Sequence, residues 1–434
     1  MTRTQLAFCL LALAPISATA QTPSLTGRWV VTADFYGTTR YARLDLTQQA
    51  EKLTGKFNGD PLEGTLTGNN LHVLAKDNDG DTNELTATLK DGTLAGKIIA
   101  INVAEKEHPL TIPFTATLVP PRPTAPPQRH EFTPTVFYRQ FSPFNKPVLT
   151  VNPGDTIHTT TVDAGGNDEH DIKRVAGGNP QTGPFYIQSA APGDTLVVHI
   201  VRLRLNRPSA GSDDGIVQSA LNSDLAVRMK DTGKSIPWSL DLANGTASPR
   251  TPSEHLAHYT VPLRPMLGCI ATAPGPGGAP PPTGDSGNWG GNMDFNEITE
   301  GATVYLPVSN PGALLYLGDA HALQGDGELN GNALETSMDV EFTVDVIPNK
   351  RIPAVRVESP THIMATGYSG YLDDAFKDAT NNMAHWLADD YKLTPSEIAQ
   401  VLGTASEYRV SEVADRNSGI VLKISKDRLA TLTK

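Results

Sequence analysis

A proline-rich run at residues 119–127, VPPRPTAPP, most constrains how this chain can fold. Its five prolines fix the backbone torsion φ and remove backbone N–H donors, so the run cannot lie inside a sheet. Segments of this composition form stiff, extended spacers. The run therefore divides the chain, and we expect a domain of residues 21–118, a linker of residues 119–130 and a second domain of residues 131–434.

The part before the linker consists of short segments of alternating polarity, and turn signals separate these segments. Asn58-Gly59 and Asp91-Gly92 are two of these signals, which recur about every ten residues. Such spacing is typical of an antiparallel meander. We therefore predict a small antiparallel β barrel or sandwich in residues 21–118.

The part after the linker is again mostly β, because residues 195–200 and 303–308 are strand-like and Gly/Pro-rich loops separate such segments. Two helices are expected only near the end of the chain. The first covers residues 371–391, where apolar side chains recur at helical spacing. The second begins at the capping box of residues 394–397 and is expected to end at Gly403. A final strand is predicted over residues 419–425.

The first twenty residues have the three parts of a secretory signal peptide: basic Arg3, an apolar stretch over residues 6–16, and the small residues Ala18-Thr19-Ala20. We expect cleavage before Gln21 and a secreted or periplasmic location. No later segment approaches the length of a membrane span. The formal net charge of −12 disfavours a nucleic-acid partner.

The densest cluster of polar residues covers residues 290–294 and 318–328. If residues 314–323 form a strand, Asp319 and His321 project from one face and place a carboxylate beside an imidazole. Glu328 has the opposite phase and joins that face only if the glycines at 325 and 327 introduce a turn or bulge. Mixed oxygen and nitrogen donors suit zinc. The alternative is an ordinary hairpin turn beside a hydrogen-bonded core histidine.

Several other residues have two interpretations each. Cys269, the single cysteine after the leader, is either a catalytic thiol or a buried structural residue, and its apolar neighbours favour the second. His158 and His170 are either additional ligands or, respectively, a strand histidine and part of a charged loop. Three aromatic residues of the front domain either fill its core or form a ligand platform: Trp29, Tyr36 and Tyr41.

Several blocks of the chain, in order, resemble the acetamidase/formamidase family. They are NPQTGPFYI at residues 179–187, PMLGCIATAP at 265–274, GGNMD at 290–294, ALETS at 333–337, and the segment from LTPSE at 393–397 to KISK at 423–426. The resemblance covers residues 132–426. It implies hydrolysis of a short aliphatic amide on a β-sandwich with a smaller C-terminal α/β part, as a homodimer.

The resemblance also implies a bound divalent metal, with zinc expected and calcium as the alternative. We assign Asp294, Asp319 and His321 as the metal ligands, because amide hydrolysis needs an activated water and an electrophile. Glu328 is assigned as the catalytic group that takes the proton from water and returns it to the amine. Asp163 is assigned to orient a ligand or the substrate.

Two other functions remain open at this point. The chain could be a non-enzymatic envelope or ligand-binding protein on an amidase-like scaffold. It could also be a metallohydrolase that attacks another carbonyl bond, such as an ester or a lactam, since the same activated water would attack either bond.

Overall fold

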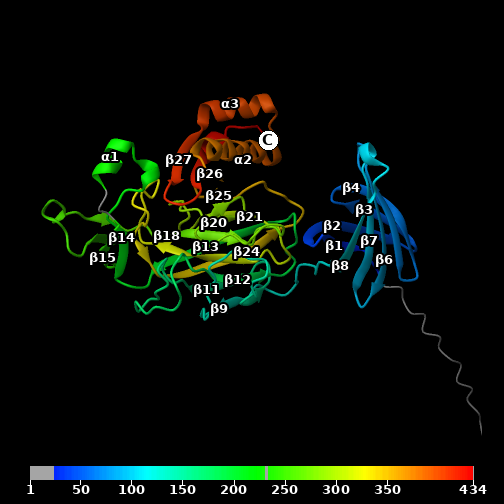
Figure 1. Cartoon of the computed structure of the whole chain (residues 1–434), viewed down its shortest axis with the longest axis horizontal. Coiled ribbons are helices and arrows are strands. Elements are labelled where there is room, and N and C mark those ends of the chain that lie inside the picture. The colour runs from blue at the N-terminus through cyan, green and yellow to red at the C-terminus, as the bar shows by residue number, and fades with distance from the viewer. Residues whose placement is uncertain (1–23, 230–232, 434) are drawn as a thin grey trace, which may run out of the picture.

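The computed structural model describes residues 24–229 and 233–433. Its strands form a closed barrel, an eleven-stranded sheet and a nine-stranded sheet, with few helices (Figure 1). This arrangement confirms the mainly β fold. The signal peptide expected at residues 1–20 lies outside the described residues. Within the described part, none of the helices combines the length and apolarity that a membrane crossing requires.

The barrel is an up-and-down meander in which each strand pairs with the next and β8 pairs with β1. Its hairpins include turns with left-handed φ, 51° at Asn58 and 50° at Asp91, each followed by a glycine. Such turns match the twist of the paired strands. The strands are β1 Gly27–Phe35, β2 Thr38–Gln49, β3 Lys52–Phe57, β4 Asp60–Thr67, β5 Asn70–Lys76, β6 Thr82–Lys90, β7 Thr93–Ile101 and β8 Leu110–Leu118, with a 3-10 turn at Val103–Glu105.

Apolar side chains fill the barrel. Leu44, Leu53 and Leu85 are completely buried, and the Trp29 ring packs among them while its Nε1 donates a hydrogen bond to the Leu25 carbonyl at 2.9 Å. An eight-stranded barrel has an interior that side chains can fill. Any ligand of this region must therefore bind outside the barrel.

The other two sheets pack face to face. Alternate residues of β13, Leu196, Val198 and Ile200, share one core with Leu267 and Ile270 of β18. This arrangement is a β-sandwich, in which each sheet buries one face. The nine-stranded sheet contains, in spatial order, β27 Glu407–Glu412, β28 Ser418–Ser425, β26 His362–Ser369, β25 Arg356–Glu358, β21 Thr303–Pro307, β13 Thr195–Leu205, β24 Met338–Ile347, β11 Thr156–Thr160 and β9 Arg129–Glu131.

The eleven-stranded sheet carries most of the residues expected at the site. Its main path is β17 Val261–Pro262, β16 Thr246–Pro249, β15 Ser235–Asp241, β14 Ser209–Asp213, β23 Glu335–Thr336, β22 Leu315–His321, β18 Met266–Thr272, β20 Gly290–Asn292 and β19 Ser286–Gly287, and off this path β12 Thr182–Ile187 pairs with both β22 and β10 Leu149–Val151. The loops around this sheet contain α1 Ser223–Arg228 and 3-10 turns at Gln218–Ala220 and Glu254–Leu256. Both β18 and β22 are buried along their whole length.

The C-terminal helices cover the end of the nine-stranded sheet (Figure 1). Helix α2, Leu372–Tyr391, packs Met383 and Leu387 against β26 and β28. Helix α3, Pro395–Ala405, begins at the expected capping box. It continues past Gly403, so the expected end was wrong, because a single glycine is tolerated within a helix at a modest cost. The short α4 is Lys426–Leu429.

Candidate metal and catalytic centre

A local change in the backbone of β22 turns two of the expected ligands away from the sandwich core. Leu315, Leu317 and Ala320 all belong to the sandwich core, although a regular strand would send residues 317 and 320 to opposite faces. Asp319 interrupts the alternation with a left-handed φ of 53°. As a result, Asp319 and His321 both project away from the core, beside each other.

The other acidic residues reach this place from several elements. Asp294 follows β20, Glu328 lies in the loop after β22, and Glu335 begins β23, where it pairs with His321. Glu412 ends β27, and Asp415 lies in the turn that follows. We call this set the acidic–histidine centre: Asp294, Asp319, His321, Glu328, Glu335, Glu412 and Asp415.

The imidazole of His321 is oriented by a single hydrogen bond. Its Nδ1 lies 2.9 Å from Gln324 Oε1, an acceptor, so Nδ1 carries the proton in the neutral ring. Gln324 Nε2 in turn donates to the Asp294 carbonyl at 2.5 Å. His321 Nε2 faces the carboxylates at 3.1 Å from Glu335 Oε1 and 3.6 Å from Asp319 Oδ2. This arrangement leaves Nε2 available as a metal ligand.

Several buried atoms of the centre have no hydrogen-bond partner. They are Asp294 Oδ1, Asp319 Oδ1, His321 Nε2 and Glu335 Oε2. Ligand atoms of Asp294, His321 and Glu328 lie within 4.8 Å of one another, as do those of Asp319, His321 and Glu335. Buried polar atoms normally find partners, so we tested whether this unpaired group could hold a cation. The donor set therefore fits a divalent metal, with zinc or calcium both compatible.

The electrostatics of the centre lead to the same conclusion. Burial, with Glu328 and Asp319 adding to it, raises the pKa of Asp294 well above its usual range. Burial likewise raises the pKa of Glu328 to about 8 and that of Glu335 to about 7. A cluster of acidic groups out of water is unfavourable unless protons or a cation neutralise it.

Two asparagines fix the carboxylates. Asn179 Nδ2 donates to Asn292 Oδ1 at 2.9 Å and to Asp319 Oδ2 at 3.3 Å. Asn292 Nδ2 donates to Asp294 Oδ2 at 2.7 Å and to Asp415 Oδ2 at 2.5 Å. Each amide occupies one oxygen of a carboxylate and leaves the other oxygen for a ligand.

Three acidic residues of the centre have strained backbone torsion angles. Besides Asp319, the non-glycine residues Asp294 and Glu328 have left-handed φ values of 41° and 47°. Non-glycine residues in this region are uncommon and gather at functional sites. A Cβ on Gly268, opposite them, would lie 2.7 Å from Asp319 Oδ2 and closer still to Asp294 Oδ1. Only glycine leaves room for these oxygens.

The structure brings together Asp294, Asp319, His321 and Glu328, but it places Asp163 outside the centre. Asp163 Oδ2 accepts a hydrogen bond from Arg207 Nη2 at 2.6 Å, and Oδ1 accepts one from the Asn167 amide at 2.8 Å. The neighbouring Ala164 carbonyl accepts from the Asn179 amide at 3.2 Å. Asp163 thus holds the loop that carries Asn179.

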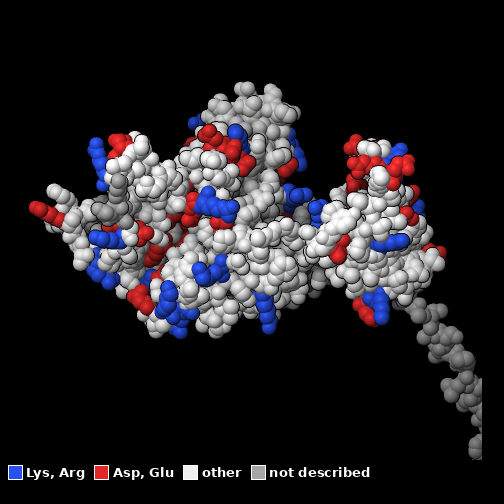
Figure 2. Space-filling view, in the orientation of Figure 1, with Lys and Arg blue, Asp and Glu red and all other residues white. Residues whose placement is uncertain are grey.

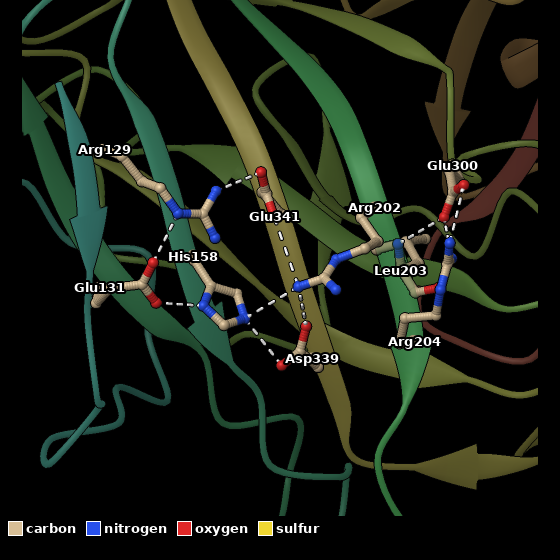
Figure 3. A network of polar contacts seen from close by, with 9 residues as sticks. All are labelled: Arg129, Glu131, His158, Arg202, Leu203, Arg204, Glu300, Asp339 and Glu341. Atoms are coloured by element: carbon tan, nitrogen blue, oxygen red, sulfur yellow. Dashed lines mark hydrogen bonds and ion pairs between the residues drawn. The ribbon is translucent and has the colours of Figure 1, made fainter. Parts of the chain in front are cut away.

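The other histidines lie away from the centre. His170 is exposed. His158 belongs to a network on the outer surface of the nine-stranded sheet (Figure 3). Its Nδ1 contacts Glu131, its Nε2 lies 2.9 Å from Asp339 Oδ2, and Arg202 lies beside it. This network is structural.

Cys269 is fully buried in β18 and packs with Phe141 and Tyr316. Burial, then the charge of Asp319, raises the pKa of its thiol. A thiol held in the protonated state is a poor nucleophile, so the structural interpretation holds.

The sequence interpretation missed Glu335, Glu412 and Asp415 as members of the centre, and Gln324 and the two asparagines as supports. Glu335 lies at the centre because β23 pairs with β22, and Glu412 reaches the centre from the edge strand β27. Their only signal in the sequence was their place in blocks that resemble the family.

The architecture of two packed β-sheets is a sandwich fold, and three solved structures resemble it. The predicted acetamidase/formamidase of Thermoanaerobacter tengcongensis is 28% identical, with a TM-score of 0.61, over 71% of this chain and 99% of that one. The acetamidase of Bacillus halodurans is also 28% identical, with a TM-score of 0.59, over 70% and 100%. The acetamidase of Yersinia enterocolitica is 28% identical, with a TM-score of 0.61, over 71% and 95%.

Residues 281–415 match the acetamidase/formamidase family model, and this segment contains the whole acidic–histidine centre. Over this segment the chain is similar to the acetamidase/formamidase family. An acetamidase of Mycolicibacterium smegmatis is 42% identical over 59 residues, 13% of this chain and 14% of that protein. A Schizosaccharomyces pombe protein assigned as a formamidase is 36% identical over 75 residues, 17% of this chain and 18% of that protein. These matches span less than a fifth of either relative.

Proposed function

We propose that this chain hydrolyses a small linear amide, such as formamide or acetamide, to a carboxylate and ammonia. The family indicates amide hydrolysis. The observation that carries the proposal is the group of buried ligand atoms without hydrogen-bond partners, on Asp294, Asp319 and His321. Unpaired buried groups that face one another are costly for stability and therefore point to a function.

Asp294, Asp319 and His321 would hold a divalent cation, zinc in the first instance and calcium as the alternative. When bound, the cation supplies Lewis acidity that polarises the substrate carbonyl and increases the acidity of water. Asn179 and Asn292 hold the carboxylates in place by the hydrogen bonds described above. These residues thus provide a fixed binding site that is largely buried from solvent.

Glu328 is the group suited to move the proton. Burial raises its pKa to about 8, so its carboxyl can accept and release a proton near neutral pH. Its Oε1 accepts a hydrogen bond from the Ala333 amide at 3.0 Å, which fixes the side chain. Glu328 would take a proton from the attacking water and donate it to the departing nitrogen. Asp163 would act at a distance, by holding the loop of Asn179.

Ammonia release from formamide and acetamide by the purified chain tests this proposal. We expect release with at least one of the two amides, and loss of release in His321→Gln. His199→Gln is the matched control, because His199 lies on β13 outside the centre. Release that continues undiminished in His321→Gln would overturn the assignment of the centre.

The same assay distinguishes the other candidate functions. Hydrolysis of an ester or lactam without ammonia release from either amide would favour a different carbonyl substrate. Absence of all hydrolysis in a folded, metal-loaded chain would favour a binding protein on an amidase-like scaffold.

We also propose export and dimer formation. Residues 1–20 would direct export with cleavage before Gln21, and N-terminal sequencing of the chain from a periplasmic or culture fraction tests this directly. A homodimer would have twice the mass of the mature chain in light scattering. A measured mass equal to that of one mature chain, at micromolar concentration, would contradict the homodimer.

A further inference from the structure

A cleft lies where the barrel meets the sandwich, and it does not include the acidic–histidine centre. Its volume is about 830 Å³. One wall is the start of β2 with the β3–β4 turn, and the other is formed by loops of the sandwich near residues 192–194, 275–277 and 349–353. Pockets of this size hold ligands of several rings. None of the residues that line the cleft belongs to the centre.

The barrel and the sandwich are joined beside the cleft by an ion pair with a buried carboxylate. Arg28 of β1 donates to Asp194 Oδ2 of the sandwich at 2.7 Å. Asp194 is almost completely buried and also accepts hydrogen bonds from the Ala191 amide at 3.0 Å and the Asn349 amide at 2.7 Å. A buried carboxylate that is paired and hydrogen-bonded in this way fixes its surroundings. The cleft therefore exists before any ligand binds.

The charge of the cleft is opposite to that of the whole chain. The formal net charge is −12, yet the cleft is lined by Arg40, Arg43 and Arg351. Among the described residues, neither Arg40 nor Arg351 has a carboxylate partner, whereas Arg43 is paired with Asp45. Figure 2 shows basic side chains gathered where the barrel joins the larger part. A positive cleft in an acidic protein concentrates anions.

The remaining side chains of the cleft are suited to hydroxyl groups. Tyr41 supplies an aromatic face that is half-buried, and the amides of Asn288 and Asn349 are exposed to the cleft. Amide and hydroxyl side chains both donate and accept hydrogen bonds, as sugar hydroxyls do. Guanidinium groups bind carboxylate and phosphate with two parallel hydrogen bonds.

We propose that this cleft binds an acidic saccharide, a hydroxylated ligand that carries a carboxylate or a phosphate group. The arginines bind the anionic group, and the amides and Tyr41 contact the sugar. Because the barrel interior is filled, the barrel can contribute to ligand binding through its outer surface, and at this junction β2 does so. This binding does not depend on the amidase reaction.

Calorimetric titration of the full mature chain tests the proposal with four probes. Trigalacturonate carries carboxylates, galactose 1-phosphate carries a phosphate, maltotriose is neutral, and inorganic phosphate has no sugar. We expect saturable binding of trigalacturonate, galactose 1-phosphate or both, and weaker binding at higher salt. The relative affinities of trigalacturonate and galactose 1-phosphate show whether the cleft prefers a carboxylate or a phosphate. Maltotriose binding of equal strength would overturn the role of charge, and equally tight inorganic phosphate would overturn the role of the sugar.

Substitutions show whether the binding takes place in the cleft. Arg351→Gln and Arg40→Gln should each weaken binding about tenfold, because each removes a charge-assisted hydrogen bond. Arg250→Gln is the matched control, since Arg250 is exposed at the end of β16 and outside the cleft. Ammonia release and thermal unfolding report that each variant is folded. Absence of binding by the folded wild type, or binding that both cleft variants leave unchanged, would refute the proposal.

Discussion

The barrel and the sandwich bury different kinds of residue. Within the described residues, every buried polar or charged side chain belongs to Ser142 or a later position, so the barrel buries apolar side chains alone. The sandwich buries Asp294, His321 and Glu328. Left-handed backbone shows the same contrast, because in the barrel it occurs in turns such as that of Asn58. The barrel core is therefore purely apolar, whereas the sandwich buries acidic groups on left-handed backbone at the acidic–histidine centre.

The largest expected effect is on catalysis in the sandwich. Glu328→Gln keeps the shape of the side chain but removes proton transfer, so kcat for amide hydrolysis should fall by about 10²–10⁴. Metal content should remain near the wild-type value, because Glu328 is not among the proposed ligands. Ammonia release and elemental analysis measure the two quantities. Glu63→Gln, on the exposed surface of the barrel, is the control, and a loss of activity below tenfold in Glu328→Gln would contradict the assignment.

The barrel should respond in stability alone. Leu85 is completely buried, and Leu85→Ala should reduce the free energy of unfolding of the barrel by about 2–5 kcal/mol. Fluorescence of Trp29 during urea unfolding provides the measurement, in a background where Trp238, Trp289 and Trp386 are replaced by phenylalanine. Ammonia release at low denaturant should stay unchanged. A parallel loss of activity in the folded variant would show that the two regions are not independent.

A single added methyl group tests how tightly the centre is built. Gly268→Ala places a Cβ against Asp319 and Asp294, so metal affinity should fall about 10–100-fold. Competition with a chromogenic chelator measures this affinity. Gly284→Ala is the control, because no atom lies within 4 Å of its added Cβ. Equal metal affinity in both variants would mean that the carboxylates can move without cost.

The smallest effect concerns pH and the network of His158. Its hydrogen bond to Glu131, with a second to Asp339, raises the pKa of His158 in the folded chain, while Arg202 beside it opposes the charge. A raised folded pKa gives stability that is full below about pH 6.5 and lost as pH rises through the folded value. His158→Gln should therefore cost less than about 1 kcal/mol, and this cost should disappear as pH rises through the raised folded pKa.

Urea unfolding at pH 5.5 and at pH 8.5 checks this prediction. The difference between wild type and His158→Gln should be larger at pH 5.5. A difference that grows toward pH 8.5 would show that the charged form of His158 does not stabilise the fold.

The sequence predicted the parts of the molecule that depend on local signals. Turns such as Asn58-Gly59 and the capping box at Thr394 are set by neighbouring residues, and both are present. The pairing of Asp319 with His321 on one side was also expected. The regular strand assumed for it was not found, because Asp319 adopts left-handed φ and shifts the alternation.

The rest of the centre depends on contacts between distant segments, which no local pattern contains. Glu335 meets His321 through strand pairing, and Glu412 arrives from the other sheet. Asp163 was expected to orient a ligand or the substrate, and its partner Arg207 lies 44 residues away in the chain. Such partners come together only when the sandwich is assembled.

We propose that the acidic–histidine centre holds a divalent cation on which amide hydrolysis depends. The most direct test measures metal content and ammonia release together, before and after chelation and after zinc or calcium is added back, in wild type and His321→Gln. We expect about one tightly held ion per wild-type chain, loss of ammonia release on chelation, and recovery with one of the two metals. His321→Gln should lose both the ion and the activity. Full ammonia release by the metal-free chain would contradict the account.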